Sequence, residues 1–353
     1  MFLVKPLAGI GYTPVNVLGR KQYREPLWFA VLAFAPVIIM ATLRGDFVDT
    51  YAYRNWFLSL PDSTIGVLKL FPADIKDKGF SILSAAIKCF ISHNDVVYFF
   101  IIAAFQGLVL IYVYRKYSIN YLMSAFLFIA STDYMSWMFN GVRQFTAVTI
   151  LFAATTFMLE KRWVPTTLLI LLAATMHQSA LLMFAIVIIA HGKAWNMRTL
   201  LWIAATIVSV LFIDIFTDIL DVIMQETQYA NMVSDWEMWG DDGTNALRVL
   251  VYSVPTILSA VGLRYIRQTD DKVVNFCTNM SIVSTGLYIL SMFTSGIFIG
   301  RLPIYASLYN YILLPWEIEN MFTKQSARII AWAMVAAYMV FYYYQMHFIW
   351  RLI

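Results

Sequence analysis

Apolar segments about as long as a membrane span recur along this chain, and the intervals between them alternate in charge. A helix needs about 20 apolar residues to cross about 30 Å of hydrocarbon. Blocks that approach this length lie at 27–43, 96–114, 119–132, 141–159, 164–176, 178–190, 199–216, 246–263, 273–299, 302–322 and 328–349. The sequence therefore predicts an all-α polytopic integral membrane protein, with about eleven membrane segments in a single membrane domain over residues 1–353.

The composition agrees with this fold class. Hydrophobic residues make up 61% of the chain and charged residues 13%, whereas soluble domains carry about 25% charged residues. The two cysteines, Cys89 and Cys277, fall in different blocks, and no Cys/His set has the spacing of a zinc site. We therefore expect no metal and no cofactor. The net charge of +4 follows the loops and gives no reason to expect nucleic acid as a partner.

Lys and Arg residues concentrate in every second interval between the blocks. The basic intervals are 1–26, 115–118, 160–163, 191–198, 264–272 and 323–328. Because cytoplasmic loops carry the excess of Lys and Arg, we expect a cytoplasmic N-terminus in a multi-pass membrane protein. The extracytoplasmic loops are then 44–95, which contains a predicted interfacial helix, and the acidic loop 217–245.

The blocks 164–176 and 178–190 are too short to cross a membrane singly, because thirteen residues of helix rise only about 20 Å. One continuous helix over both blocks would place the basic residues on either side of it at opposite membrane faces. We therefore predict a short hairpin that opens toward the cytoplasm, with its tip at residues 176–179.

A few arginines are placed against the positive-inside rule, on the predicted outer side. They are Arg44, Arg54, Arg143, Arg248, Arg301 and Arg351. The guanidinium fork matches phosphate oxygens bidentately, and ionisable groups at membrane depth are usually functional. Arg143 and Gln144 follow an Asn140-Gly141 turn and open a span, where free backbone N–H groups also favour an anion. The alternative is that these arginines contact lipid headgroups or pair with nearby acids.

Three residues are candidates for a general base on the outer side, either Asp49 or Asp46, and His177. Asp49 lies with Asp46 in the loop after the first span, and His177 is the only histidine inside an apolar block. A carboxylate or imidazole can remove the proton of a hydroxyl group as that oxygen forms a new bond. The alternatives are that both acids merely pair with Arg44 and Arg54, and that His177 is a hydrogen-bonded packing residue.

Several short motifs follow one another along residues 40–310. They are Asp49-Thr50-x-x-Tyr53, Gly79-Phe80, Asn140-x-x-Arg143-Gln144, Lys161-Arg162, His177-x-Ser179-Ala180-Leu181 and Arg301-x-x-x-Tyr305. In this order they resemble the EpsG-type exopolysaccharide polymerases, which are related in role to the Wzy repeat-unit polymerases.

The resemblance implies a multi-pass glycosyltransferase of the bacterial inner membrane with a GT-C-like arrangement. Such an enzyme would transfer a growing glycan from undecaprenyl diphosphate to the next lipid-linked repeat, and so build capsular polysaccharide, exopolysaccharide or O-antigen at the periplasmic face. The expected partners are the undecaprenyl-diphosphate-linked oligosaccharide, membrane lipid and a regulator of chain length. We expect the diphosphate to bind Arg143, Arg301, Arg44 and Gln144, with Asp49 or His177 as the base, and Tyr53, Arg54, Asn140, Arg248 and Tyr305 to position the substrate.

Three other functions remain open on the residues alone. A flippase for the same lipid would also use arginines, but it favours charges along a membrane path and often inverted repeats, and no repeat is visible. A membrane acyltransferase with His177 as base would need catalytic groups that reach a cytoplasmic acyl donor. A glycan ligase shares nearly all the chemistry of a polymerase.

Overall fold

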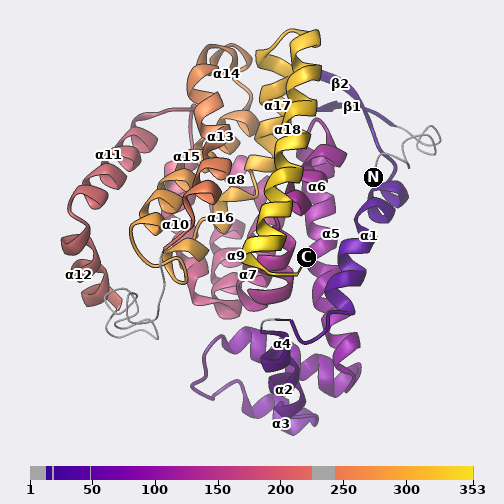
Figure 1. Ribbon diagram of the computed structural model, residues 1–353. Helices are drawn as coiled ribbons and strands as arrows, with labels where there is room; N and C mark the ends of the chain where they lie inside the picture. Colours follow the sequence, from indigo (N-terminus) through magenta and orange to yellow (C-terminus); the bar gives the residue numbers. More distant parts are fainter. Residues whose placement is uncertain (1–12, 18–19, 48, 225–242, 353) are drawn as a thin grey trace. The chain divides into compact units, whose positions relative to one another are not determined.

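The computed structural model describes residues 13–17, 20–47, 49–224 and 243–352. Packing divides the chain into two compact units, residues 1–182 with 323–353 and residues 183–322; Figure 1 labels their elements. Every predicted apolar block coincides with at least one helix. This agreement follows from the sequence, because each block is long, apolar and bounded by charged or turn-forming residues.

The first unit is helical apart from a two-stranded antiparallel hairpin, which is an exception to the predicted all-α class. Its elements are β1 (Thr13–Val17), β2 (Arg20–Arg24), α1 (Leu27–Thr42), α2 (Thr50–Ser59), α3 (Thr64–Lys69), α4 (Lys78–Phe90), α5 (Asp95–Tyr117), α6 (Tyr121–Ala130), the π-helix η2 (Tyr134–Asn140), α7 (Val142–Ala153), α8 (Thr155–Leu159), α9 (Trp163–Met176), the 3₁₀ helix η3 (Gln178–Leu182), α18 (Lys324–Tyr344) and the π-helix η6 (Gln345–Ile349).

Helix α5 organises the first unit, because α1 and α7 both pack along it. The Asn94 side chain accepts the Val96 N–H at 2.8 Å and caps the helix. The last turn of α5 carries Arg115 and Lys116, whose charges complement the helix dipole. Gly107 allows α1 to approach closely, since a Cβ at this position would lie 2.6 Å from Cγ1 of Ile38.

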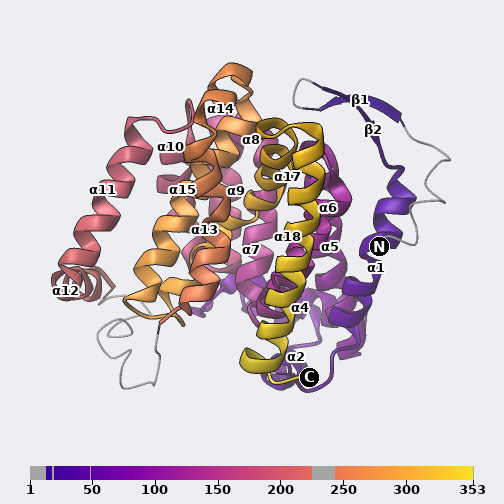
Figure 2. The same ribbon diagram turned by 45° about the horizontal axis from the view of Figure 1, so that its top comes forward.

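The two ends of α5 lie in different surroundings. At its start, Arg54 of α2 donates to Asp95 at 2.6 Å. At its end, Lys116 donates to the Thr156 hydroxyl at 2.9 Å, and its carbonyl accepts from Arg24 at 3.2 Å. A 23-residue helix rises about 33 Å. Figures 1 and 2 accordingly show α2–α4 and the β1–β2 hairpin at opposite ends of this unit.

Every secondary-structure element in the described residues of the second unit is a helix. Its elements are α10 (Met183–Ala190), α11 (Met197–Leu211), α12 (Ile213–Met224), α13 (Ala246–Val261), α14 (Leu263–Thr269), α15 (Lys272–Met292), the 3₁₀ helix η5 (Ile299–Arg301), α16 (Ile304–Ser307) and α17 (Asn310–Met321). Helix α15 lies at the centre and packs against α10, α11, α13 and α17. Most of its side chains are buried, including many hydroxyl and amide groups.

These buried polar groups of α15 hold the loop that follows α10. The carbonyl of the Asn275 side chain accepts the Ala194 N–H at 2.9 Å. The Asn279 amide donates to the carbonyls of Ala190 at 3.0 Å and Lys193 at 3.2 Å. Buried amides are usually hydrogen-bonded, and the loop backbone supplies partners for the side chains of Asn275 and Asn279.

Two predicted features of the second unit differ in detail from the structure. The block 199–216 breaks at Phe212, where α11 and α12 bend by 104°, and α13 and α14 bend by 70°. The predicted acidic loop 217–245 therefore begins inside α12. Residues 225–242 of that loop lie outside the described residues.

Among the described residues, three helices are long and apolar enough to cross a membrane: Asp95–Tyr117, Lys272–Met292 and Lys324–Ile349. The number rises to five if each bent pair forms one span, and shorter apolar helices accompany them. The chain is thus a multi-pass membrane protein. The count of about eleven segments and the GT-C-like arrangement stay predictions, as does the short hairpin, although the chain does break at His177, its predicted tip.

Candidate functional site

An ion pair joins the start of α7 to the start of α4. Arg143, the second residue of α7, donates from Nη1 to Oδ2 of Asp77 at 2.9 Å. The Asp77 side chain is 2% exposed and that of Arg143 is 34% exposed. Asp77 directly precedes α4 with φ of 48°, a left-handed conformation that Asp tolerates better than most residues. The pair buries its carboxylate and leaves part of its guanidinium accessible.

Asp77 connects this pair to a third segment. Burial raises the pKa of the Asp77 carboxyl, and this outweighs the lowering by Arg143, by Lys76 and by a hydrogen bond from the backbone N–H of Gln178. Gln178 opens η3 directly after α9 ends. One carboxylate therefore links α4, α7 and the break between α9 and η3.

His177 occupies that break in an extended conformation, with φ of −159° and ψ of 122°. Its Nδ1 lies 2.7 Å from the Ser179 hydroxyl, and its ring is half-buried. The next residue, Gln178, donates its backbone N–H to Asp77, and Asp77 also pairs with Arg143. The His177 motif therefore lies beside the Arg143 motif. His177 is not among the residues that line the pocket described below.

The Gly79-Phe80 motif begins with a glycine because no side chain fits at this position. A Cβ at Gly79 would lie 2.1 Å from Oγ1 and 2.6 Å from Cβ of Thr175 on α9. Only a glycine allows α4 and α9 to approach this closely. The close contact fixes the start of α4, and with it Asp77, beside the His177 break.

A pocket of about 350 Å³ opens beside the guanidinium. It is lined by Asp49, Ala52, Tyr53, Trp56 and Arg143. Four of these residues lie at helical spacing on one face of α2 and its N-terminal cap, because positions three, four and seven residues apart share a helix face. The pocket thus combines a carboxylate and a guanidinium with two aromatic rings.

The aromatic side chains of the pocket are held by their neighbours. The Arg143 guanidinium carbon lies 5.8 Å from the centre of the Tyr53 ring, within the range of a cation–π contact. The Trp56 ring stacks on Phe80, with 5.7 Å between centroids and 14° between planes. Phe80 is fully buried, so the Trp56 ring is supported from behind.

Arg44 is buried rather than placed on the pocket wall. Its Nε donates to the Ala41 carbonyl at 2.6 Å and its Nη1 to the Phe139 carbonyl at 3.0 Å. The guanidinium also lies 4.3 Å from the centre of the Phe99 ring. Burial lowers the pKa of Arg44 to about 10. This geometry joins the end of α1 to η2, and the predicted contact with diphosphate stays untested.

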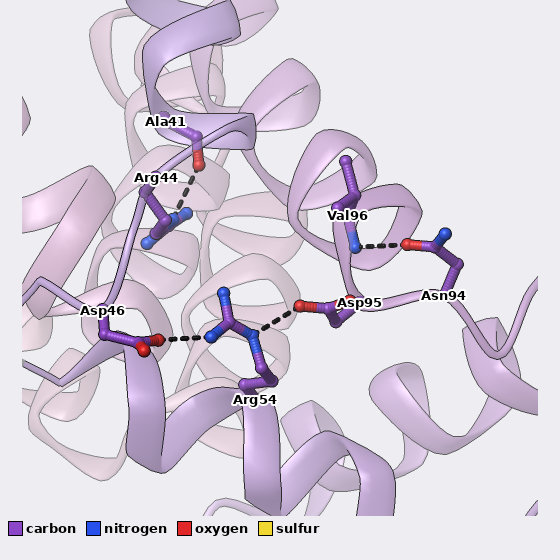
Figure 3. Close-up of polar contacts among 7 residues, drawn as sticks. All are labelled: Ala41, Arg44, Asp46, Arg54, Asn94, Asp95 and Val96. Atoms are coloured by element: carbon purple, nitrogen blue, oxygen red, sulfur yellow. Dashed lines mark hydrogen bonds and ion pairs between the residues drawn. The ribbon is translucent and has the colours of Figure 1, made fainter.

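Arg54 forms ion pairs with Asp95 and Asp46, as Figure 3 shows. The hydrogen bond to Asp95 is the largest cause that raises the pKa of Arg54. The predicted pairing of a loop acid with Arg54 is therefore seen for Asp46. Asp49, the other acid of this loop, lines the pocket instead.

The turn predicted at Asn140-Gly141 is confirmed, since η2 ends at Asn140 and α7 begins at Val142. Asn140 is half-buried and Gln144 is buried. Neither belongs to the residues that line the pocket. Their predicted contacts with substrate stay predictions, whereas their place around the start of α7 is shown.

Arg248, Arg301 and Tyr305 belong to the second unit. Arg248 lies in the first turn of α13, with its guanidinium carbon 5.5 Å from the centre of the Tyr252 ring. Arg301 ends η5 and is exposed, whereas Tyr305 is buried.

The second unit brings the segments that carry Arg248 and Arg301 to one region, at the C-terminal end of α15. The Thr244 N–H, just before α13, donates to the Ser291 carbonyl at 2.8 Å. A Cβ at Gly300, the neighbour of Arg301, would lie 2.6 Å from Oγ1 of Thr244. The loops that carry Arg248 and Arg301 therefore pack on each other at this end.

Two residues in or beside the pocket, Trp56 and Asp77, were not among the site residues predicted from the sequence. Asp77 stands in a charged run, which is typical of a solvated loop, and its only signal is the Gly79-Phe80 motif directly after it. Trp56 lies seven residues after Asp49, the spacing of one helix face. A helical projection of the loop would have placed Trp56 beside Asp49 and Tyr53.

Comparison with known proteins agrees with the order of the motifs. No curated protein and no solved structure matches the chain. The model of the EpsG family matches residues 27–350, nearly the whole chain. This match confirms the resemblance predicted from the motifs. The chain belongs to the EpsG family.

Proposed function

We propose that this protein is a glycosyltransferase that polymerises undecaprenyl-diphosphate-linked oligosaccharide repeats into an extracellular polysaccharide. Membership in the EpsG family supports a role in exopolysaccharide polymerisation. The observation that carries the proposal is the pocket that places the Asp49 carboxylate and the Arg143 guanidinium on one cavity wall. These two groups supply what glycosyl transfer from a diphosphate requires, a base and a cation for the leaving group.

In this proposal Arg143 binds the diphosphate of the donor. A guanidinium donates two parallel hydrogen bonds to phosphate oxygens, and the free N–H groups of the first turn of α7 favour an anion at the same place. Lys76 lies close to this guanidinium, because its pKa is lowered first by burial and then by the charge of Arg143. As the bond between the anomeric carbon and the phosphate oxygen breaks, the negative charge that develops on the diphosphate is stabilised by Arg143.

Asp49 is the base that this geometry favours. It lines the pocket, whereas His177 lies outside the lining residues with its Nδ1 on Ser179. Asp49 accepts the proton of the acceptor hydroxyl while the new bond forms between that oxygen and the anomeric carbon. In the proposal His177 has a structural role. It helps to position η3, whose first residue, Gln178, donates its backbone N–H to Asp77.

Arg301 is proposed as a further ligand for lipid diphosphate. Its guanidinium is exposed at the end of η5, beside the loop that leads to Arg248. The two arginines give the second unit a cationic region of its own. Tests of Arg301 are therefore independent of tests of Arg143.

The sidedness of the reaction is part of the proposal. The pocket lies near the start of α5, and the basic residues Arg24, Arg115 and Lys116 lie near its end. A 23-residue helix separates these regions by about 33 Å, which is about the thickness of the hydrocarbon core. Because basic loops face the cytoplasm, the pocket would face the periplasm of a bacterial inner membrane, where lipid-linked repeats are polymerised.

The experiment uses the purified full-length protein and one lipid-linked repeat unit, without nucleotide sugar. We expect longer lipid-linked oligomers from the wild type and from the control R264Q, whose arginine is exposed at α14. We expect the variants R143Q and D49N to form at most 1% of that product, since removal of such groups costs about 10²-fold or more. Full activity in well-folded R143Q would remove Arg143 from the mechanism. Transfer of the glycan only to a different acceptor would identify a ligase instead.

A further inference from the structure

The pocket has a polar end and an aromatic end. Asp49 and Arg143 provide the charges, and Trp56 lies two helical turns after Asp49 on the same face of α2. Ala52 lies between them and contributes only a methyl group. The small side chain leaves space along the helix face between the charged groups and the indole ring.

The indole ring of Trp56 is fixed in orientation. It stacks on Phe80 at 5.7 Å and 14°, and Phe80 is fully buried at the start of α4. The neighbouring Gly79 lies so close to Thr175 that a Cβ would not fit between them, so this part of α4 is closely packed on α9. A ring fixed in this way gives a preformed apolar surface, which binds a ligand with little loss of side-chain entropy.

A sugar ring fits this combination of groups. A pyranose has a face of C–H groups and a rim of hydroxyls, so it can place the face on an indole and the rim toward polar groups. The volume of about 350 Å³ lies at the lower end of the 300–1,000 Å³ range of ligand sites. It suits one sugar with its phosphates better than several sugars of a chain.

We infer that the pocket binds the sugar attached directly to the diphosphate, with the C–H face of that sugar on the Trp56 ring. The inference rests on the proposed function, since it takes the diphosphate to lie at Arg143. Trp56 is then a specificity-determining residue, which recognises the glycan part of the ligand while Arg143 recognises the diphosphate part.

The test measures binding of two ligands to purified full-length protein. One ligand is undecaprenyl diphosphate without sugar, and the other is the single-repeat lipid from cells that lack the polymerase. We expect W56L to weaken binding of the repeat lipid by about 5- to 10-fold and to change binding of the sugarless lipid less than twofold. The variant W56F, which keeps an aromatic ring, retains most of the affinity. Y51L is the control, because Tyr51 is an exposed aromatic on α2 outside the pocket lining.

Each outcome has a separate meaning. Equal loss for both ligands in W56L, or no loss for either, overturns the sugar contact and leaves the proposed function standing. Unchanged binding of both ligands in R143Q removes the diphosphate site itself. If W56L fails to fold, A52L fills the space in front of the indole without disturbing its stack on Phe80. We then expect A52L to lose the repeat lipid selectively, and unchanged binding of that lipid would overturn the inference.

Discussion

Arg143 and Asp77 lie 66 positions apart in the chain, yet their side chains meet at 2.9 Å. Because the carboxylate is buried and the guanidinium is partly exposed, Asp77 fixes the direction in which Arg143 points. We expect D77N to lower kcat about 10- to 100-fold, the range that a misplaced catalytic group can cause, with a smaller change in KM. The polymerisation assay measures this, and D77E should recover part of the activity. A D77N variant with wild-type kcat would contradict the positioning role.

The pH dependence of stability offers a second test of Asp77. Burial raises the pKa of its carboxyl above the ordinary value of 3.8, so the folded state binds this proton more strongly than the unfolded state. The stability contributed by the group is fully present below about pH 3.8 and is lost as the pH rises through the folded-state pKa. The D77N variant cannot titrate there. We therefore expect the thermal stability of the wild type relative to D77N to fall as the pH rises above about 3.8, and a difference that grows with pH would contradict this sign.

A third prediction concerns the contact between α4 and α9. In G79A the new Cβ would meet Thr175 at 2.1 Å, so one helix must shift. We expect a loss of about 1–3 kcal/mol in stability, measured by thermal unfolding in detergent. The double variant G79A/T175G removes the side chain that clashes and should recover part of the loss. Purely additive effects in this double-mutant cycle would show that the clash is not the cause.

The positions of the helices could be predicted from the sequence, because apolar blocks and their polar flanks are local features. The cap of α5 is an example, since Asn94 and Asp95 precede the apolar run and Arg115 and Lys116 close it. The break at Phe212 could not be predicted in this way, because the apolar pattern continues across it. Its position depends on packing rather than on composition.

The candidate site was predictable only in part, for a similar reason. Arg143 and Asp49 stand out in the sequence because a charge next to an apolar block is conspicuous there. Asp77 and Lys76 stand among other charges, and only the fold distinguishes the buried carboxylate from its exposed neighbours. Residues whose role depends on a contact across 66 positions cannot be separated from loop residues by local pattern alone.

A fourth prediction separates two roles for Arg44. Its guanidinium donates to the carbonyls of Ala41 and Phe139 and lies outside the pocket lining. Lysine cannot reproduce this fork of donors. We therefore expect R44K to lower the thermal stability and to bind undecaprenyl diphosphate as the wild type does. A folded R44K with unchanged stability and clearly weaker binding would instead support the role as a diphosphate ligand that was predicted from the sequence.

A fifth prediction concerns Glu317, which is fully buried in α17 of the second unit. Its two carboxyl oxygens accept no hydrogen bond from the residues that the structure describes. A buried polar group without partners costs about 1–3 kcal/mol, and replacement by an apolar group of similar shape can be stabilising. We therefore expect E317L to raise the apparent Tm in detergent, whereas E319L, at an exposed position of the same helix, leaves it unchanged. A lower Tm for E317L would mean that the carboxyl has a partner in the membrane, and loss of activity at unchanged Tm would give this acid a functional role.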